Sequence, residues 1–149
     1  MPRILIIGYG NPLRGDDAFG QEAAARLQDI ILDPDVEILA LHQLTPELME
    51  AVSRAERVLF IDARDGPAAG EISLEPLEPQ AESSAAFTHF STPAGLLAGA
   101  RALYGKCPAA TLLTAGAAGF DLGAGLSGPV RRALREAVDH AIPNWIRGT

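Results

Sequence analysis

A continuous apolar run closed by a glycine, residues 3–8, constrains the fold of this chain more than any other feature. A run without polar alternation is typical of a strand that a parallel sheet buries on both faces. Similar runs predict three more strands, at residues 36–41, 57–63 and 110–115. The sequence therefore predicts a mostly parallel sheet, which needs helices to cover its two faces.

Patterns of helical spacing separate these runs. Apolar residues recur every three or four positions over residues 23–31 and 130–142, as on the buried face of a helix. Three helix starts share a hydroxyl residue able to cap the first turn and a proline that needs no amide donor. These starts are Thr45–Pro46, Thr92–Pro93 and Ser127–Gly128–Pro129.

Residues 70–77 alternate between polar and apolar side chains, which is typical of a half-buried strand at the edge of a sheet. Strands and helices that alternate along a chain favour an α/β fold. We expect a three-layer sandwich with a twisted, mostly parallel five-stranded sheet and one antiparallel edge strand. The chain of 149 residues matches one domain, residues 1–149. Ligands of such folds bind at the carboxyl ends of the strands.

The composition of the chain argues against several classes of binding partner. The formal net charge of −7 lacks the basic footprint of a nucleic-acid binder. The single cysteine, Cys107, has no partner for an internal disulfide and lies in an expected turn without the features of a nucleophile. No apolar stretch predicts a signal peptide or a membrane span. We expect a cytoplasmic monomer that binds neither nucleic acid nor membrane.

The segment after the first strand, residues 8–20, carries glycines and an acidic pair. A dinucleotide site is disfavoured because Leu13 stands at the third glycine position and two carboxylates would face the pyrophosphate. Asp16 and Asp17 lie where a helix should begin, so they are expected to cap it. One aspartate suffices for that role. The other is then free to bind a cation or to act as a general base, next to glycines that let a ligand approach.

Two more candidate residues follow expected strands or precede an expected helix. Asp62 ends the run 57–63, where it either accepts backbone amides or serves as a ligand or catalytic group. His89 precedes the helix expected at Pro93 and, with Asp17 and Asp62, would form an oxygen, oxygen, nitrogen set suited to nickel or zinc. His42, after the second strand, can line the same edge or fill its loop.

Taken together, these residues resemble the hydrogenase maturation protease family, endopeptidases that trim the C-terminal extension from the large subunit of nickel-iron hydrogenases. The resemblance is carried by the opening motif from Gly8 to Asp17, and also by Gln43–Leu48, Asp62, His89, Gly116 and Gly125–Ser127. It implies that Asp17, Asp62 and His89 bind nickel, which the precursor supplies and the enzyme does not carry. Ala18 is one departure, since the family commonly has glycine there.

The resemblance implies a hydrogenase large-subunit precursor as partner, with metal insertion as the checkpoint for cleavage. Gly10, Asn11 and His42 are then expected to contact substrate. Asp17 or Asp16 could activate water, the nickel could polarise the carbonyl, or Asp17 and Asp62 could share a proton as in aspartic proteases. An alternative function is a nickel-binding chaperone or delivery module, or a non-peptidase paralogue of the same fold.

Overall fold

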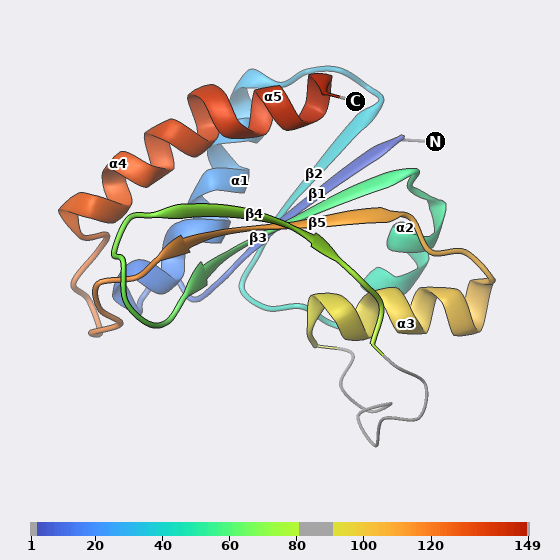
Figure 1. Cartoon of the computed structure of the whole chain (residues 1–149), viewed down its shortest axis with the longest axis horizontal. Coiled ribbons are helices and arrows are strands. Elements are labelled where there is room, and N and C mark those ends of the chain that lie inside the picture. Colours follow the sequence, from blue (N-terminus) through green and yellow to red (C-terminus); the bar gives the residue numbers. More distant parts are fainter. Residues whose placement is uncertain (1–2, 81–90, 149) are drawn as a thin grey trace.

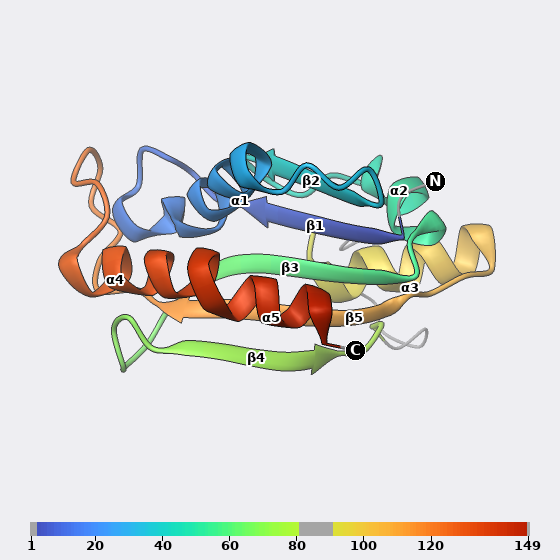
Figure 2. The same ribbon diagram turned by 90° about the horizontal axis from the view of Figure 1, so that it is seen from above.

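The computed structural model describes residues 3–80 and 91–148 and contains one five-stranded sheet (Figures 1 and 2). The strand order is β2-β1-β3-β5-β4, with parallel pairs throughout except the antiparallel edge pair of β4 and β5. The predicted sheet, including its antiparallel edge, is confirmed. The strands are β1 Ile4–Tyr9, β2 Val36–Leu41, β3 Arg57–Arg64, β4 Ile72–Leu77 and β5 Ala109–Gly116.

Helices cover both faces of the sheet and complete the predicted three layers (Figure 1). On one face lie α1 Phe19–Ile30, α4 Gly128–Glu136, a π-helical turn at Ala137–Ala141 and α5 Ile142–Arg147. On the other face lie α2 Leu48–Arg54 and α3 Pro93–Tyr104. In the described part of the chain, no helix combines the length and apolar composition needed to cross a bilayer.

Successive residues of the central strands pack into opposite cores, which explains their uninterrupted apolar character. Ile4 and Ile6 of β1 pack against the α1 and α4 side, whereas Leu5 and Ile7 pack against the α2 and α3 side. The same alternation continues to the end of β1, so Tyr9 faces the α2 and α3 side.

The three predicted helix starts have different outcomes. Thr92 caps α3 as expected, since its hydroxyl accepts a hydrogen bond from the Gly95 amide at 3.1 Å. The predicted start at Thr45–Pro46 is wrong: these residues form a turn, and α2 begins at Leu48. Ser127 is the N-cap residue of α4, but its side chain makes no cap hydrogen bond.

The last helical segment extends beyond the predicted range and runs from Gly128 to Arg147. The π-helical turn ends two residues before Pro143, which has no N–H to continue the regular ladder of helical hydrogen bonds. Near the end of this segment, the Arg57 guanidinium lies 4.1 Å from the centre of the Trp145 ring and donates to the carbonyls of Trp145 and Ile146. Arg57 thereby joins α5 to the amino end of β3.

Candidate active site at the carboxyl edge of the sheet

The first helix begins directly against the ends of β1 and β3. A Cβ on Gly20 would lie 2.2 Å from the carbonyl oxygen of Ile61 and 2.6 Å from that of Tyr9. A Cβ on Gly8 would lie 2.0 Å from the carbonyl oxygen of Gly20. Only glycine permits backbones to approach this closely. The short 3-10 turn Gly15–Ala18, which carries both aspartates, is therefore held at the carboxyl edge of the sheet.

Asp17 is half-buried and fixed by the residues that precede it. Its Oδ2 accepts a hydrogen bond from the Asn11 amide at 2.8 Å. Gly10 lies so close that a Cβ there would be 1.9 Å from the Asp17 carbonyl oxygen. The Asn11 side chain accepts from the Leu13 amide at 2.9 Å and so closes the turn. Gly10 and Asn11, predicted to contact substrate, lie beside Asp17 and position its carboxylate.

Asp62 lies at the end of β3, close to Asp17 although 45 positions separate them in the sequence. Its Oδ1 accepts a hydrogen bond from the Ala63 amide at 2.7 Å. Burial raises the pKa of Asp62 to about 6; hydrogen bonds from Tyr9 and Ala63 oppose this rise, and the charge of Asp17 adds to it. The negative charge of Asp17 thus disfavours ionisation of Asp62.

Tyr9 is a site residue that the sequence analysis missed. Burial raises the pKa of its phenol well above the ordinary value, and the carboxylates of Asp62 and Asp17 raise it further. The phenol therefore stays protonated and donates a hydrogen bond to Asp62. Because Tyr9 continues the alternation of Leu5 and Ile7, its position on the same face as Asp62 could have been found from the strand pattern.

Asp16 has a different role from its neighbour. It is 1% exposed and accepts four hydrogen bonds: from the amides of Ala118 at 2.7 Å, Gly119 at 3.2 Å and Ser127 at 2.7 Å, and from the Ser127 hydroxyl at 2.9 Å. Although burial alone would raise the pKa of Asp16, these hydrogen bonds lower it. Asp16 thus holds the loop 117–127 against the 3-10 turn, and both of its oxygens are occupied.

The helix-capping interpretation of the acidic pair is wrong. Neither aspartate caps the 3-10 turn or α1, whose N-cap residues are Arg14 and Ala18. Ser127, expected to cap α4, donates its hydroxyl to Asp16. Ala18 has ordinary right-handed helical angles, φ −72° and ψ −9°, and is buried, so this backbone position does not require the glycine common in the family.

The two candidate histidines remain predictions. His42 is exposed in the turn after β2, and no described hydrogen bond or ion pair links it to Asp17 or Asp62. His89 lies outside the described residues. Within residues 3–80 and 91–148, no group of three or more His, Cys, Asp or Glu side chains is arranged to hold a metal ion. Asp17 and Asp62 are the two predicted nickel ligands that lie in the described part of the chain.

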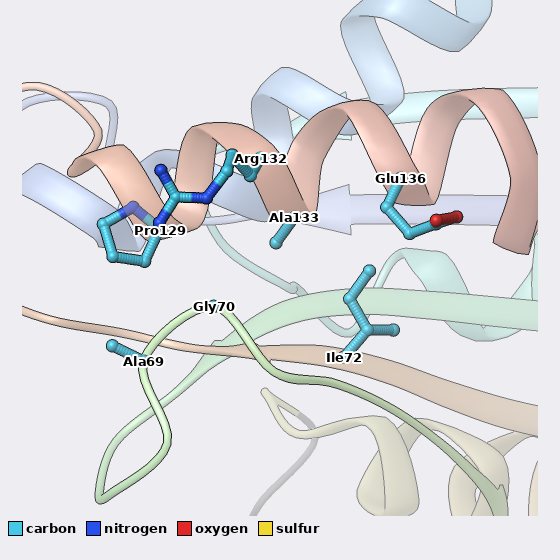
Figure 3. A pocket seen from close by; sticks show the side chains of 7 residues that line it. All are labelled: Ala69, Gly70, Ile72, Pro129, Arg132, Ala133 and Glu136. Atoms are coloured by element: carbon cyan, nitrogen blue, oxygen red, sulfur yellow. The ribbon is translucent and has the colours of Figure 1, made fainter.

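A cavity of about 420 Å³ opens nearby but is not lined by either carboxylate (Figure 3). Its walls come from the segment before and at the start of β4, including Gly70 and Ile72, and from α4, including Pro129, Arg132 and Glu136. These residues lie on the α1 and α4 side of the sheet, whereas Asp62 and Tyr9 lie on the other. The cavity is therefore separate from the candidate site.

The fold is similar to several solved structures. HycI, a NiFe hydrogenase maturation protease from Thermococcus kodakarensis, is 26% identical over 95% of this chain and 90% of its own, with a TM-score of 0.77. The hydrogenase maturating endopeptidase HybD from E. coli is 26% identical over 98% of this chain and 94% of its own, with a TM-score of 0.77. No protein-family model matches the chain, and no curated protein matches its sequence.

A third similar structure is the hydrogenase 2 maturation peptidase from Thaumarchaeota archaeon SCGC_AB-539-E09, 25% identical over 96% of this chain and 97% of its own, with a TM-score of 0.70. These similarities extend over nearly the whole of each chain. The solved structures that this chain resembles over nearly its whole length are thus hydrogenase maturation proteases.

Proposed function

We propose that this protein is an endopeptidase that removes the C-terminal extension of a nickel-iron hydrogenase large-subunit precursor after nickel has been inserted. The similar structures from Thermococcus kodakarensis and E. coli are named as a maturation protease and a maturating endopeptidase, which supports a peptidase role in hydrogenase maturation. Nickel is part of the substrate in this proposal, and the protein recognises it on the precursor.

The observation that carries the proposal is the pairing of Asp17 and Asp62. Two partly buried carboxylates from different elements repel each other at one strand edge, and the charge of Asp17 contributes to the raised pKa of Asp62. A cation bound between such groups relieves both the repulsion and the cost of burying the charge. Carboxylate oxygens with a histidine nitrogen suit a borderline divalent ion such as nickel, and His89 is our third proposed ligand.

Asp17 is also our candidate for water activation. The Asn11 amide binds Oδ2, while Oδ1 accepts no hydrogen bond from a described residue and is available to a ligand or a water molecule. Asp16 is unsuited to this role because it is buried and both of its oxygens are engaged. A carboxylate at this position would take a proton from water as the hydroxyl attacks the scissile carbonyl, and would return it to the departing amine.

The test is cleavage of purified, nickel-loaded precursor, followed by intact-mass spectrometry. Asp17→Asn, Asp62→Asn and His89→Ala should each abolish removal of the extension while circular dichroism shows a folded protein. Asp65→Asn is the matched control, because Asp65 follows the same strand but its carboxylate is exposed and binds only the adjacent Gly66 amide. The control should cleave like the wild type.

Cleavage retained in any two of the three site variants would refute the assignment of the ligands. Tight nickel binding by the isolated protein, together with intact precursor, would instead support a nickel-delivery function. The peptidase proposal expects nickel binding to be weak until the precursor contributes its own ligands.

A further inference from the structure

Arg64 is a cation at the candidate site that the proposed chemistry does not use. It ends β3 two residues after Asp62, so both side chains face the α2 and α3 side of the sheet. Thr114 of β5 lies directly beside Asp62 in the strand register, and its hydroxyl accepts a hydrogen bond from Arg64 Nη1 at 2.7 Å. The Arg64 guanidinium therefore lies over β5, one strand away from Asp62.

The backbone of the turn before β4 and of the end of β5 lies close to this guanidinium. Arg64 Nη2 donates to the Glu71 carbonyl at 3.1 Å. Gly116, the register partner of Arg64, leaves room for it, since a Cβ there would lie 3.3 Å from Nη2 and 2.2 Å from the carbonyl oxygen of Ala68. Ala68 itself has a φ of 68°, a left-handed conformation that costs an alanine free energy. The turn before β4 thus closes over Arg64 despite a local strain.

Arg64 lacks a carboxylate partner in the part of the chain that the structure describes. The salt bridges found there join Arg3 to Glu56 and Arg54 to Glu50. Arg64 is partly buried, and its two acceptors are a neutral hydroxyl and a neutral carbonyl. A guanidinium has five N–H donors in a planar fork that fits a carboxylate. Donors therefore remain for an anion on a bound molecule, in a chain whose own net charge is −7.

We propose that Arg64 binds a carboxylate of the substrate peptide and thereby selects precursors that carry an acidic residue near the cleavage site. This inference rests on the proposed peptidase function. Neighbouring strands lie about 4.8 Å apart and each residue rises about 3.3 Å, so Arg64 and Asp62 hold different groups of the substrate.

The test measures cleavage kinetics of the nickel-loaded precursor by Arg64→Gln and Arg64→Lys. Losing a two-point, charge-assisted contact should raise KM roughly ten- to hundredfold in Arg64→Gln while kcat changes little. Arg64→Lys should lie in between, because lysine keeps the charge and loses the fork. Arg57→Gln is the matched control: Arg57 is also partly buried and held by two hydrogen bonds, but it lies at the opposite end of β3. It should lower the melting temperature and leave KM unchanged.

The partner carboxylate is found by replacing each Asp or Glu near the cut in the precursor with its amide. For one of these precursor variants, the KM of the wild-type enzyme should rise as much as it does when Arg64→Gln cleaves the unchanged precursor. The same precursor variant should not raise the KM of Arg64→Gln any further. A KM for Arg64→Gln equal to the wild-type value, or full additivity of every replacement, would overturn the proposal. If Arg64→Gln fails to fold, Thr114→Val decides, since it removes the hydroxyl that orients the guanidinium and should raise KM by a smaller factor.

A binding measurement separates this inference from the proposed function. The probe is a fluorescent synthetic peptide with the sequence of the precursor around the cut, measured by anisotropy without metal. Peptide binding by the wild type that weakens in Arg64→Gln, without cleavage of any precursor, would support Arg64 and reject the peptidase. Cleavage by the wild type, together with unchanged peptide affinity and KM in Arg64→Gln, would support the peptidase function and reject the role of Arg64.

Discussion

Replacing Asp16 by asparagine should destabilise the protein strongly without removing a group that we place at the chemical step. The Asp16 carboxylate binds three amides and one hydroxyl in a site that is 1% exposed. An asparagine oxygen at the Oδ2 position keeps three of these hydrogen bonds without the charge. Its amide group then faces the Ser127 amide, so two donors meet.

The magnitude follows from these contacts. A hydrogen bond to a charged group contributes about 1 kcal/mol more than a neutral one, and a buried donor without an acceptor costs about 1–3 kcal/mol. Three weakened bonds and one lost bond give about 4–6 kcal/mol, a large part of the 5–15 kcal/mol typical of a whole domain. At 2–4 °C per kcal/mol for a chain of this size, the melting temperature should fall by roughly 10–20 °C.

The pH dependence gives the sharper test. Because the pKa of Asp16 is lowered in the folded state, its contribution is fully present above the unfolded-state pKa of about 4 and is lost as the pH falls through the folded-state pKa. Urea denaturation should show the full difference between wild type and Asp16→Asn at pH 7 and a smaller one at pH 3. Asp121→Asn, an exposed change in the same loop, should have no effect. A difference below about 1 kcal/mol at pH 7, or one equally large at pH 3, would refute the reasoning.

Three further predictions concern stability. Asp62→Asn should stabilise the protein by about 3 kcal/mol at pH 7.5 while abolishing cleavage, because a pKa raised to about 6 in the folded state means that ionising Asp62 above that pH costs stability. Urea denaturation should find no such gain near pH 4, and a destabilised variant at pH 7.5 would contradict this prediction. Gly20→Ala should destabilise the protein by about 3 kcal/mol because its Cβ would clash with the Ile61 carbonyl. Gly119→Ala, whose Cβ meets no atom, should have the melting temperature of the wild type. Equal melting temperatures for the two variants would show that α1 can shift away from β3 without cost. Thr92→Ala should destabilise the protein by about 1 kcal/mol through loss of the α3 cap. An unchanged melting temperature would show that this cap does not contribute to stability.

The sheet could be predicted because strands that are buried on both faces are continuously apolar in sequence. Residues 4–7 and 58–61 are apolar at every position since each side chain packs into one of two cores. The wrong start of α2 has a local cause as well. A hydroxyl residue before a proline signals a cap or a turn equally, and here the carbonyls of Thr45 and Pro46 accept the amides of Leu48 and Met49.

The site was predicted only in part, because some of its contacts join residues that lie far apart in the sequence. Asp17 and Asp62 could be identified from their positions after two adjacent parallel strands. The partners of Asp16 lie 102 to 111 residues away, and no pattern near Asp16 distinguishes it from Asp17. Tyr9 and Arg64 could have been identified from strand alternation alone, since each shares the face of Asp62.

The antiparallel edge strand carries residues that disfavour pairing with a strand from another molecule. The sheet stops at β4, whose outer side could in principle pair with a strand from a second copy. Pro76 removes one N–H from this strand, and the exposed Glu75 adds a charge beside it. A strand from a second copy that approached β4 would therefore meet a charged side chain and a position that offers no amide donor. The composition of β4 thus disfavours continuation of the sheet from one molecule into the next.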